Sequence, residues 1–354
     1  MSDNEAEETF GEEEDNAEEA GGEEGDEEVL GEEEEKLGEE EEVEEEEKVP
    51  DLALTEEHIA ECLSLLCKTG DGLAHAYVRL DVHDRQLTDI NILKSFIHLR
   101  YLDLSKNNLK DISCLSALTH LLTLKADYNL LTTVKLEEMP FLQVASFNDN
   151  KMKTLEGCSH PMLEHLSVNN NLISKVDTLE PAKLARLHTL ELRGNKLTTT
   201  DGFCLPNLKN LFLAQNVITV IEGLDRMSSL TTLHMRGNQV KTLDGFTDGL
   251  QMLQYINLRE NSVMEVKTEV PKLQCLPLLR AMVLSENPCT EEDDYRIEVL
   301  IALRKLERLD KEEYQEEERT EAEAIAEQRK EEEANAENHT EQYYVNEEVS
   351  DEED

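Results

Sequence analysis

The chain has 354 residues, and its 81 Asp and Glu against 34 Lys and Arg give a formal net charge of −47 at pH 7. The charge lies mainly at the ends, because residues 1–48 carry 27 acidic residues against 2 lysines and residues 311–354 carry 19 acidic against 4 basic residues. Acidic ends repel the phosphates of DNA and RNA, so the composition argues against direct nucleic-acid binding.

Residues 1–49 form the first predicted segment, an acidic tail of glutamate and glycine. Its apolar residues are too few to offset the entropy of an ordered chain, so we expect it to be disordered. The tail starts with MSDNEAEETF rather than with a charged and then apolar signal, and no stretch reaches 18 apolar residues. We therefore expect neither secretion nor a membrane span. The seven cysteines lack the spacing of a disulfide framework, which fits a reducing, cytoplasmic compartment.

Residues 50–76 are predicted to form an N-terminal capping helix. Thr55 is a suitable N-cap, the helix should run to about Lys68, and Gly70 should end it. A helix with one apolar face can cover the core that the first unit of a repeat array leaves open. The residues at helical spacing on that face are Ile59, Cys62, Leu63 and Leu66.

Residues 77–289 contain about ten registers of one pattern, L-x-x-L-x-L-x-x-N-x-L. Its clearest copies are LHTLELRGNKL, LKNLFLAQNVI and LTTLHMRGNQV. The pattern is typical of leucine-rich repeats and predicts an α/β repeat solenoid, a horseshoe with a parallel concave sheet and short helical turns on the convex side. The asparagine recurs every 21 to 26 residues, at Asn107, Asn129, Asn150, Asn171, Asn195, Asn216, Asn238, Asn261 and Asn287.

The leucines and the asparagine of the pattern have different predicted roles. The leucines point inward and stack on the same leucines of the next repeat. The asparagine turns the chain, and its amide can bond backbone groups that the turn leaves unpaired. A leucine in place of Asn216 should therefore cost roughly 1–3 kcal/mol.

Residues 290–310 are predicted to form a C-terminal cap, because the repeat does not restart after Asn287 and Pro288. The segment YRIEVLIALRKLERLD indicates a helical stretch that ends in a Leu-x-x-Leu turn. It resembles the caps of leucine-rich repeats in a phosphatase regulator and in dynein light chains. Residues 311–354 are predicted to be a Glu-rich solvated helix or a disordered acidic tail. A helix that continues from the cap and docks on another surface is the alternative.

Patterns for catalysis and for metal binding are not found in the sequence. It contains no phosphate-binding loop, no dinucleotide-binding glycine pattern and no H-E-x-x-H, and its ten histidines lack companions at metal-ligand spacing. We therefore expect no enzyme activity, no cofactor, no metal and no small-molecule substrate.

The concave face provides the candidate site, which is for protein binding. Its outward positions in the C-terminal half combine arginines with aromatic side chains, a composition enriched in binding hot spots. Any repeat face must carry polar side chains, so a merely solvated face is the alternative. The candidate residues are Arg193, Phe212, His234, Arg236, Tyr255 and Arg259.

Several segments resemble one family of axonemal proteins with short leucine-rich repeats. They are SLLCKTGDGLAHAYVRLDVHDRQLTDI, IHLRYLDLS, SHPMLEHL and KLERLDKEEYQEEER. The resemblance implies a structural component of the radial spokes in motile cilia and sperm flagella, located in the axonemal cytoskeleton. It also implies radial-spoke head and stalk proteins as partners, and a role in spoke assembly and flagellar motility.

Two other classes of protein remain open. This repeat length and cap also occur in a regulatory subunit of a serine/threonine phosphatase. Acidic nuclear histone-binding chaperones combine a short array with an acidic tail, although here the array is longer and the heavier acidic run is N-terminal.

Overall fold

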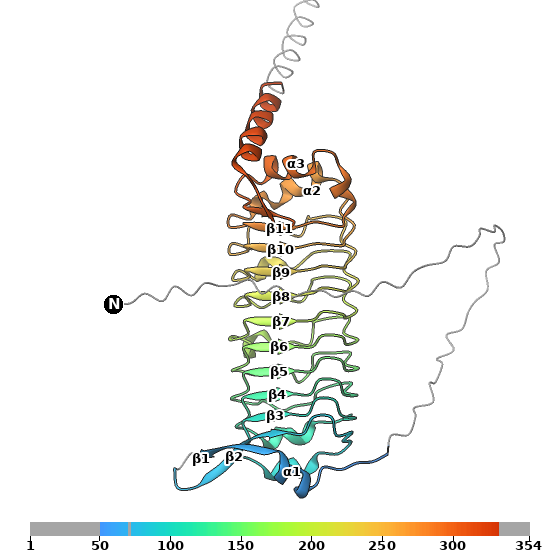
Figure 1. Ribbon diagram of the computed structural model, residues 1–354, viewed down its shortest axis with the longest axis vertical. Coiled ribbons are helices and arrows are strands. Elements are labelled where there is room, and N and C mark those ends of the chain that lie inside the picture. Colours follow the sequence, from blue (N-terminus) through green and yellow to red (C-terminus); the bar gives the residue numbers. More distant parts are fainter. Residues whose placement is uncertain (1–49, 70–71, 333–354) are drawn as a thin grey trace, which may run out of the picture. The chain divides into compact units, whose positions relative to one another are not determined.

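The computed structural model describes residues 50–69 and 72–332 (Figure 1). The predicted acidic tail at 1–49, and the C-terminal tail from residue 333 on, lie outside the described residues. The described chain forms a sheet of 13 strands, in which each strand is hydrogen-bonded to the next in sequence order. An open, mostly parallel sheet with one strand per repeat confirms the predicted leucine-rich repeat solenoid.

Each of the ten predicted registers contains one strand, and these ten strands run parallel. Nine of them have three residues, because the chain turns at the asparagine soon after the strand, and β2 has seven. The ten strands are β2 (His75–Asp81), β3 (Tyr101–Asp103), β4 (Thr123–Lys125), β5 (Val144–Ser146), β6 (His165–Ser167), β7 (Thr189–Glu191), β8 (Asn210–Phe212), β9 (Thr232–His234), β10 (Tyr255–Asn257) and β11 (Ala281–Val283).

Five of the nine segments that connect the strands from β2 to β11 contain the short helical turns that the repeat length predicted, and the other four contain no helix. The longest step, between Asn261 and Asn287, contains a short α-helix followed directly by a 3-10 helix. The turns are η1 (Asn91–Ser95), η2 (Ser113–Ala117), η3 (Pro181–Lys183), η4 (Leu224–Arg226), α2 (Val266–Glu269), η5 (Val270–Cys275) and η6 (Pro288–Glu291).

The consensus leucines form one continuous core along the solenoid. In one central repeat the consensus residues Leu208, Leu211, Leu213 and Ile218 are completely buried. Burial of such a side chain stabilises a protein by roughly 1.5–3 kcal/mol. Because every repeat contributes the same layer, the core stays open at its two ends and needs a cover at each.

The signature asparagines are buried and bond the backbones of two repeats. All nine are only 3–8% exposed. The amide group of Asn216 donates to the carbonyl of Leu213 at 3.0 Å and to that of Leu192, in the preceding repeat, at 2.9 Å. Its Oδ1 accepts from the N–H of Leu197 at 3.1 Å. The predicted role of the asparagine is confirmed, and the amide also joins each repeat to the one before it.

The residue before each signature asparagine has a left-handed backbone conformation. The angle φ is 53° at Tyr128, 55° at Gln215, 63° at Gly194 and 65° at Gly237. Side chains with a Cβ occupy this region at a cost, which glycine avoids. The glycines at 194 and 237 therefore meet a requirement of the turn.

The N-terminal end of the core is covered by α1 (Glu56–Cys62). The Thr55 hydroxyl accepts a hydrogen bond from the N–H of His58 at 3.3 Å, which confirms Thr55 as the N-cap. Ile59 projects from the helix into the core and is buried there. The short helix thus covers the first repeat.

A β-hairpin follows α1, so the prediction of a helix as far as Lys68 was wrong. β1 (Leu63–Lys68) is extended and pairs antiparallel with β2. β2 has seven residues, and β3 pairs with only one of its two edges. The backbone groups on the other edge of β2, from His75 to Leu80, find their partners in β1. The predicted stop at Gly70 lies outside the described residues.

The C-terminal cap consists of α3 (Tyr295–Ala302), β12 (Arg308–Leu309) and β13 (Glu312–Glu313). β12 is parallel to β11, and β13 is antiparallel to β12. The Leu-x-x-Leu turn at Leu306 and Leu309 therefore starts one more strand of the sheet. The expectation that the repeat does not restart was wrong for this strand, whereas α3 is the helical stretch that was predicted before the Leu-x-x-Leu turn.

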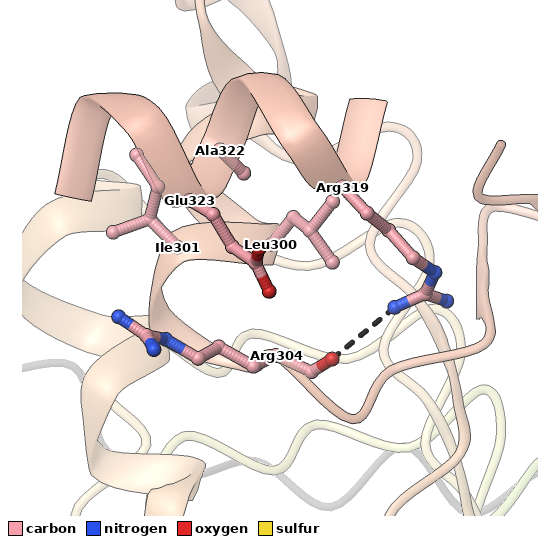
Figure 2. Close-up of a pocket in the computed structure, with 6 residues that line it drawn as sticks. All are labelled: Leu300, Ile301, Arg304, Arg319, Ala322 and Glu323. Carbon is pink, nitrogen blue, oxygen red and sulfur yellow. Dashed lines mark hydrogen bonds between the residues drawn. The ribbon is translucent and has the colours of Figure 1, made fainter. Parts of the chain in front are cut away.

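Residues 316–332 form the predicted Glu-rich helix, and one side of it packs on α3 of the cap, so this helix is not wholly solvated. Ala322 and Ala326 are buried on its inner side. Arg319 donates to the carbonyl of Arg304 at 3.2 Å (Figure 2). A cavity of about 30 Å³, enough for a water molecule, is lined by Leu300, Ile301, Arg304, Arg319, Ala322 and Glu323.

Ion pairs fasten this helix to the cap. Arg329 donates to the two carboxylate oxygens of Glu298 at 2.6 and 2.8 Å, and Arg296 pairs with the carboxylate of Glu318. The hydrogen bonds from Arg329 lower the pKa of the buried Glu298. The helix therefore adds both apolar and charged contacts to the C-terminal cover.

Candidate protein-binding face

Side chains alternate between the core and the outer side of the sheet along each short strand. In β8 the central Leu211 is buried, and Asn210 and Phe212 point to the outer side. We call this outer side the sheet face. It is the surface that the sequence predicted as the binding site.

Four of the six predicted site residues contact one another in a row on the sheet face. The guanidinium carbon of Arg193 lies 4.7 Å from the centre of the Phe212 ring. The rings of Phe212 and His234 stack at 4.8 Å, and those of His234 and Tyr255 lie 5.0 Å apart at an angle of 42°. We call these four residues the aromatic ladder.

The register of the strands explains the geometry of the aromatic ladder. Phe212 and His234 are directly opposite each other on β8 and β9, which allows their rings to stack. Tyr255 is opposite Thr232 rather than His234, so its ring approaches His234 diagonally. Rings at this separation contribute about 0.5–1.5 kcal/mol beyond their buried area.

The other two predicted residues lie beside the aromatic ladder and form ion pairs with the following repeat. Arg236 Nε lies 3.4 Å from a carboxylate oxygen of Glu260, and Arg259 pairs with Glu286. Both glutamates are exposed, and exposed pairs contribute only about 0–1 kcal/mol. A carboxylate of a partner protein can therefore compete for these arginines at little cost.

The environment of His234 keeps its imidazole uncharged. Burial between its neighbours, and to a lesser extent the charge of Arg193, lowers the pKa of His234 to about 4. The aromatic ladder therefore presents one fixed cation at its Arg193 end and neutral rings along the rest at neutral pH.

The N-terminal half of the sheet face carries a polar network that the sequence reasoning missed. Asp127 accepts hydrogen bonds from the Ser146 hydroxyl at 2.6 Å and the Asn148 N–H at 2.7 Å. The same arrangement is repeated one strand further along, where Asn148 takes the place of Asp127. The polar network consists of Asp127, Ser146, Asn148, Ser167, Asn169 and Glu191.

The polar network meets the aromatic ladder at Glu191 and Asn169. Burial alone raises the pKa of Glu191, but hydrogen bonds from His165 and Asn169 outweigh burial and lower it to about 2. The Oδ1 of Asn169 also accepts from the backbone N–H of Arg193 at 2.8 Å. Hydrogen bonds thus fix the backbone that positions the first residue of the ladder.

The described residues contain no group of three or more His, Cys, Asp or Glu that is arranged to hold a metal ion. Within the same residues, no helix is both long and apolar enough to cross a membrane.

Comparison with known proteins agrees with this fold. Residues 186–338 and 98–121 match family models described as leucine-rich repeats, so the chain is a leucine-rich repeat protein. It is 53% identical over 272 residues to leucine-rich repeat-containing protein 23 of Homo sapiens. The alignment covers 77% of this chain and 79% of the human protein. The Mus musculus protein of that name is 54% identical and covered to 80%. The chain belongs to the leucine-rich repeat-containing protein 23 family.

A solved structure shares the fold at much lower sequence similarity. The crystal structure of a TLR13–ssRNA13 complex superposes with a TM-score of 0.53 at 19% identity. The match covers 66% of this chain and 35% of that chain. This similarity concerns the repeat architecture alone.

Proposed function

We propose that this chain is a non-enzymatic structural subunit of the radial spokes in motile cilia and sperm flagella, where it supports spoke assembly and motility. The family and the repeat fold imply a protein-binding scaffold. The observation that carries the radial-spoke proposal is the identity of 53% over 272 residues to leucine-rich repeat-containing protein 23 of Homo sapiens. The sequence segments quoted above resemble this family, and that resemblance implies an axonemal protein. The proposed location is the axonemal cytoskeleton, and the proposed partners are radial-spoke head and stalk proteins.

The sheet face around the aromatic ladder is the proposed docking surface. Arginines and aromatic side chains dominate the energetics of protein interfaces. In the aromatic ladder they are held by one another and by the strands beneath, so little side-chain entropy is lost when a partner binds. Arg236 and Arg259 extend this surface with charges that a partner carboxylate can share.

A charge-reversed variant tests the docking surface. In ciliated cells, glutamate at Arg193, Arg236 and Arg259 together should prevent incorporation of the folded protein into axonemes. The matched control carries glutamate at Arg186, Arg226 and Lys241, which are exposed elsewhere, and should incorporate normally. Thermal unfolding of both variants checks that the repeats remain folded.

The two parts of the proposal have separate refutations. If the charge-reversed variant incorporates as well as the unaltered chain, the sheet face is not the docking surface. Proximity labelling with the unaltered chain tests the location itself. Labelling of nuclear proteins or of a phosphatase in place of spoke proteins would refute the radial-spoke assignment.

A further inference from the structure

Among residues 50–69 and 72–332, no strand lies beside the outer edge of the hairpin formed by β1 and β2. β1 is the terminal strand of the 13 in the described chain. The hairpin extends beyond the column of short strands (Figure 1). An edge strand presents backbone N–H and carbonyl groups that can pair with an added strand.

Large apolar side chains are exposed along this hairpin. Leu66 is 56% exposed, Leu73 89% and Tyr77 48%. Leu66 and Tyr77 are cross-strand partners and therefore lie side by side on the sheet face. Leu65 is 52% exposed and has a φ of 58°, an unfavourable conformation for a bulky residue. The adjacent exposed pair of Leu66 and Tyr77 is the kind of apolar surface that marks an interaction site.

The opposite end of the sheet is protected against pairing. β13 has only two residues, both glutamates, and the helix at 316–332 packs on the adjacent cap. Short, charged edge strands and a covering helix are the usual protections of a sheet edge. β1 has six residues and a single charge. The two ends of the sheet therefore differ in the length and the charge of their edge strands, which control whether a further strand can be added.

The charges around β1 indicate the chemistry of its partner. The cross-strand pairs that share a side with Leu66 and Tyr77 are Lys68 with His75 and Ser64 with Arg79. These six positions carry two cations, a histidine and no carboxylate. An acidic segment complements them, although the chain as a whole has a net charge of −47.

A second copy of the chain fits this edge less well. Two copies joined through β1 would share a strip about 20 Å long and one strand wide. A stable interface buries roughly 1,200 Å² or more. A single extended segment can add to such an edge, because backbone hydrogen bonds supply its affinity.

We propose that β1 is a second docking site, at which an extended acidic segment of another protein adds to the sheet as a strand. The segment places an apolar residue beside Leu66 and a carboxylate two positions along, beside Lys68. Backbone hydrogen bonds provide affinity, and the alternating side chains provide selectivity. This site is separate from the aromatic ladder and does not depend on the radial-spoke assignment.

A random linear peptide library displayed on phage and selected on the full chain tests this site. The expected peptides alternate apolar and acidic residues, and their binding slows exchange of the backbone amides of 63–68. A variant with Leu66→Glu and Tyr77→Glu should bind them at least about tenfold more weakly. Met264→Glu changes an exposed apolar residue elsewhere and serves as the matched control, with unchanged binding.

Several results would overturn the proposal. Selected peptides without alternation, equal binding by the Leu66→Glu, Tyr77→Glu variant, or amide protection at the aromatic ladder would each do so. Sedimentation should show a monomer, and a dimer that Leu66→Glu abolishes would make a second copy the occupant instead. If deletion of residues 1–48 is needed before any peptide binds, the chain's own acidic segment is the occupant.

Discussion

Replacement of Asn216 by leucine tests how the buried amides hold the repeats together. The substitution removes hydrogen bonds to the carbonyls of Leu192 and Leu213 and from the N–H of Leu197. Each of these two carbonyls keeps a second donor, because Asn195 also bonds Leu192 and Asn238 also bonds Leu213.

The free-energy cost of the substitution follows from the groups that lose their only partner. At Asn216 this is the buried N–H of Leu197, so the expected loss is about 1–3 kcal/mol. Asn287 is the last asparagine of the row, and no later amide replaces its bond to the Leu284 carbonyl. Asn287→Leu leaves that carbonyl and the Val263 N–H unpaired, so about twice the loss is expected.

Urea unfolding of the full chain, followed by circular dichroism, measures both losses, and amide exchange at Leu197 reports the local effect. Asn207→Leu alters an exposed asparagine and should change stability by less than about 0.5 kcal/mol. Equal losses for Asn216→Leu and Asn287→Leu would show that the shared carbonyls do not compensate. A loss at Asn216 as small as that at Asn207 would show that its buried bonds contribute nothing.

Three further predictions concern acid stability, the aromatic ladder and the C-terminal cap. Burial lowers the pKa of His160 to about 4, whereas the unfolded chain takes up its proton near 6.5. Stability should therefore fall as the pH drops from 6.5 to 4, by up to about 3 kcal/mol from this residue, and urea unfolding of His160→Gln should show a shallower dependence. Phe212→Ala exposes the neighbouring ring, so NMR titration should find the pKa of His234 raised from about 4 towards 6.5; an unchanged value would mean that Phe212 does not shield it. Ala322→Glu places a charge in the buried contact, so amide exchange across 316–332 should accelerate while exchange in the repeats stays the same; slow exchange throughout would mean that the contact does not hold the helix.

The repeat architecture was predictable because the pattern assigns the same residue types to the same backbone positions. A buried leucine such as Leu211 and a turning asparagine such as Asn216 each have one role, which recurs along the array. The hairpin was not predictable in this way. Leu63 and Leu66 fit one face of a helix, and the need of β2 for a pairing partner arises only from the arrangement of the strands.

The aromatic ladder was partly predictable for the same reason. Parallel strands in register place equal pattern positions side by side, which brings Phe212 next to His234. The contact of Arg193 with Phe212 depends on side-chain conformation, which the pattern does not specify. The polar network did leave a signal, because Ser146 and Ser167 occupy equal positions in adjacent repeats. Equal polar residues at equal positions indicate a hydrogen-bonded row.

The sharing of each asparagine between two repeats makes the internal units interchangeable. The backbone groups that Asn216 bonds are the same, in kind and position, as those that Asn195 and Asn238 bond. A whole repeat can therefore be removed or duplicated inside the array, and the new neighbours find matching donors and acceptors. Such a change alters the separation between the hairpin edge and the aromatic ladder in steps of about 4.8 Å. The number of repeats therefore sets the distance between the two proposed sites, and only the N-terminal and C-terminal covers of the core have no equivalent elsewhere in the array.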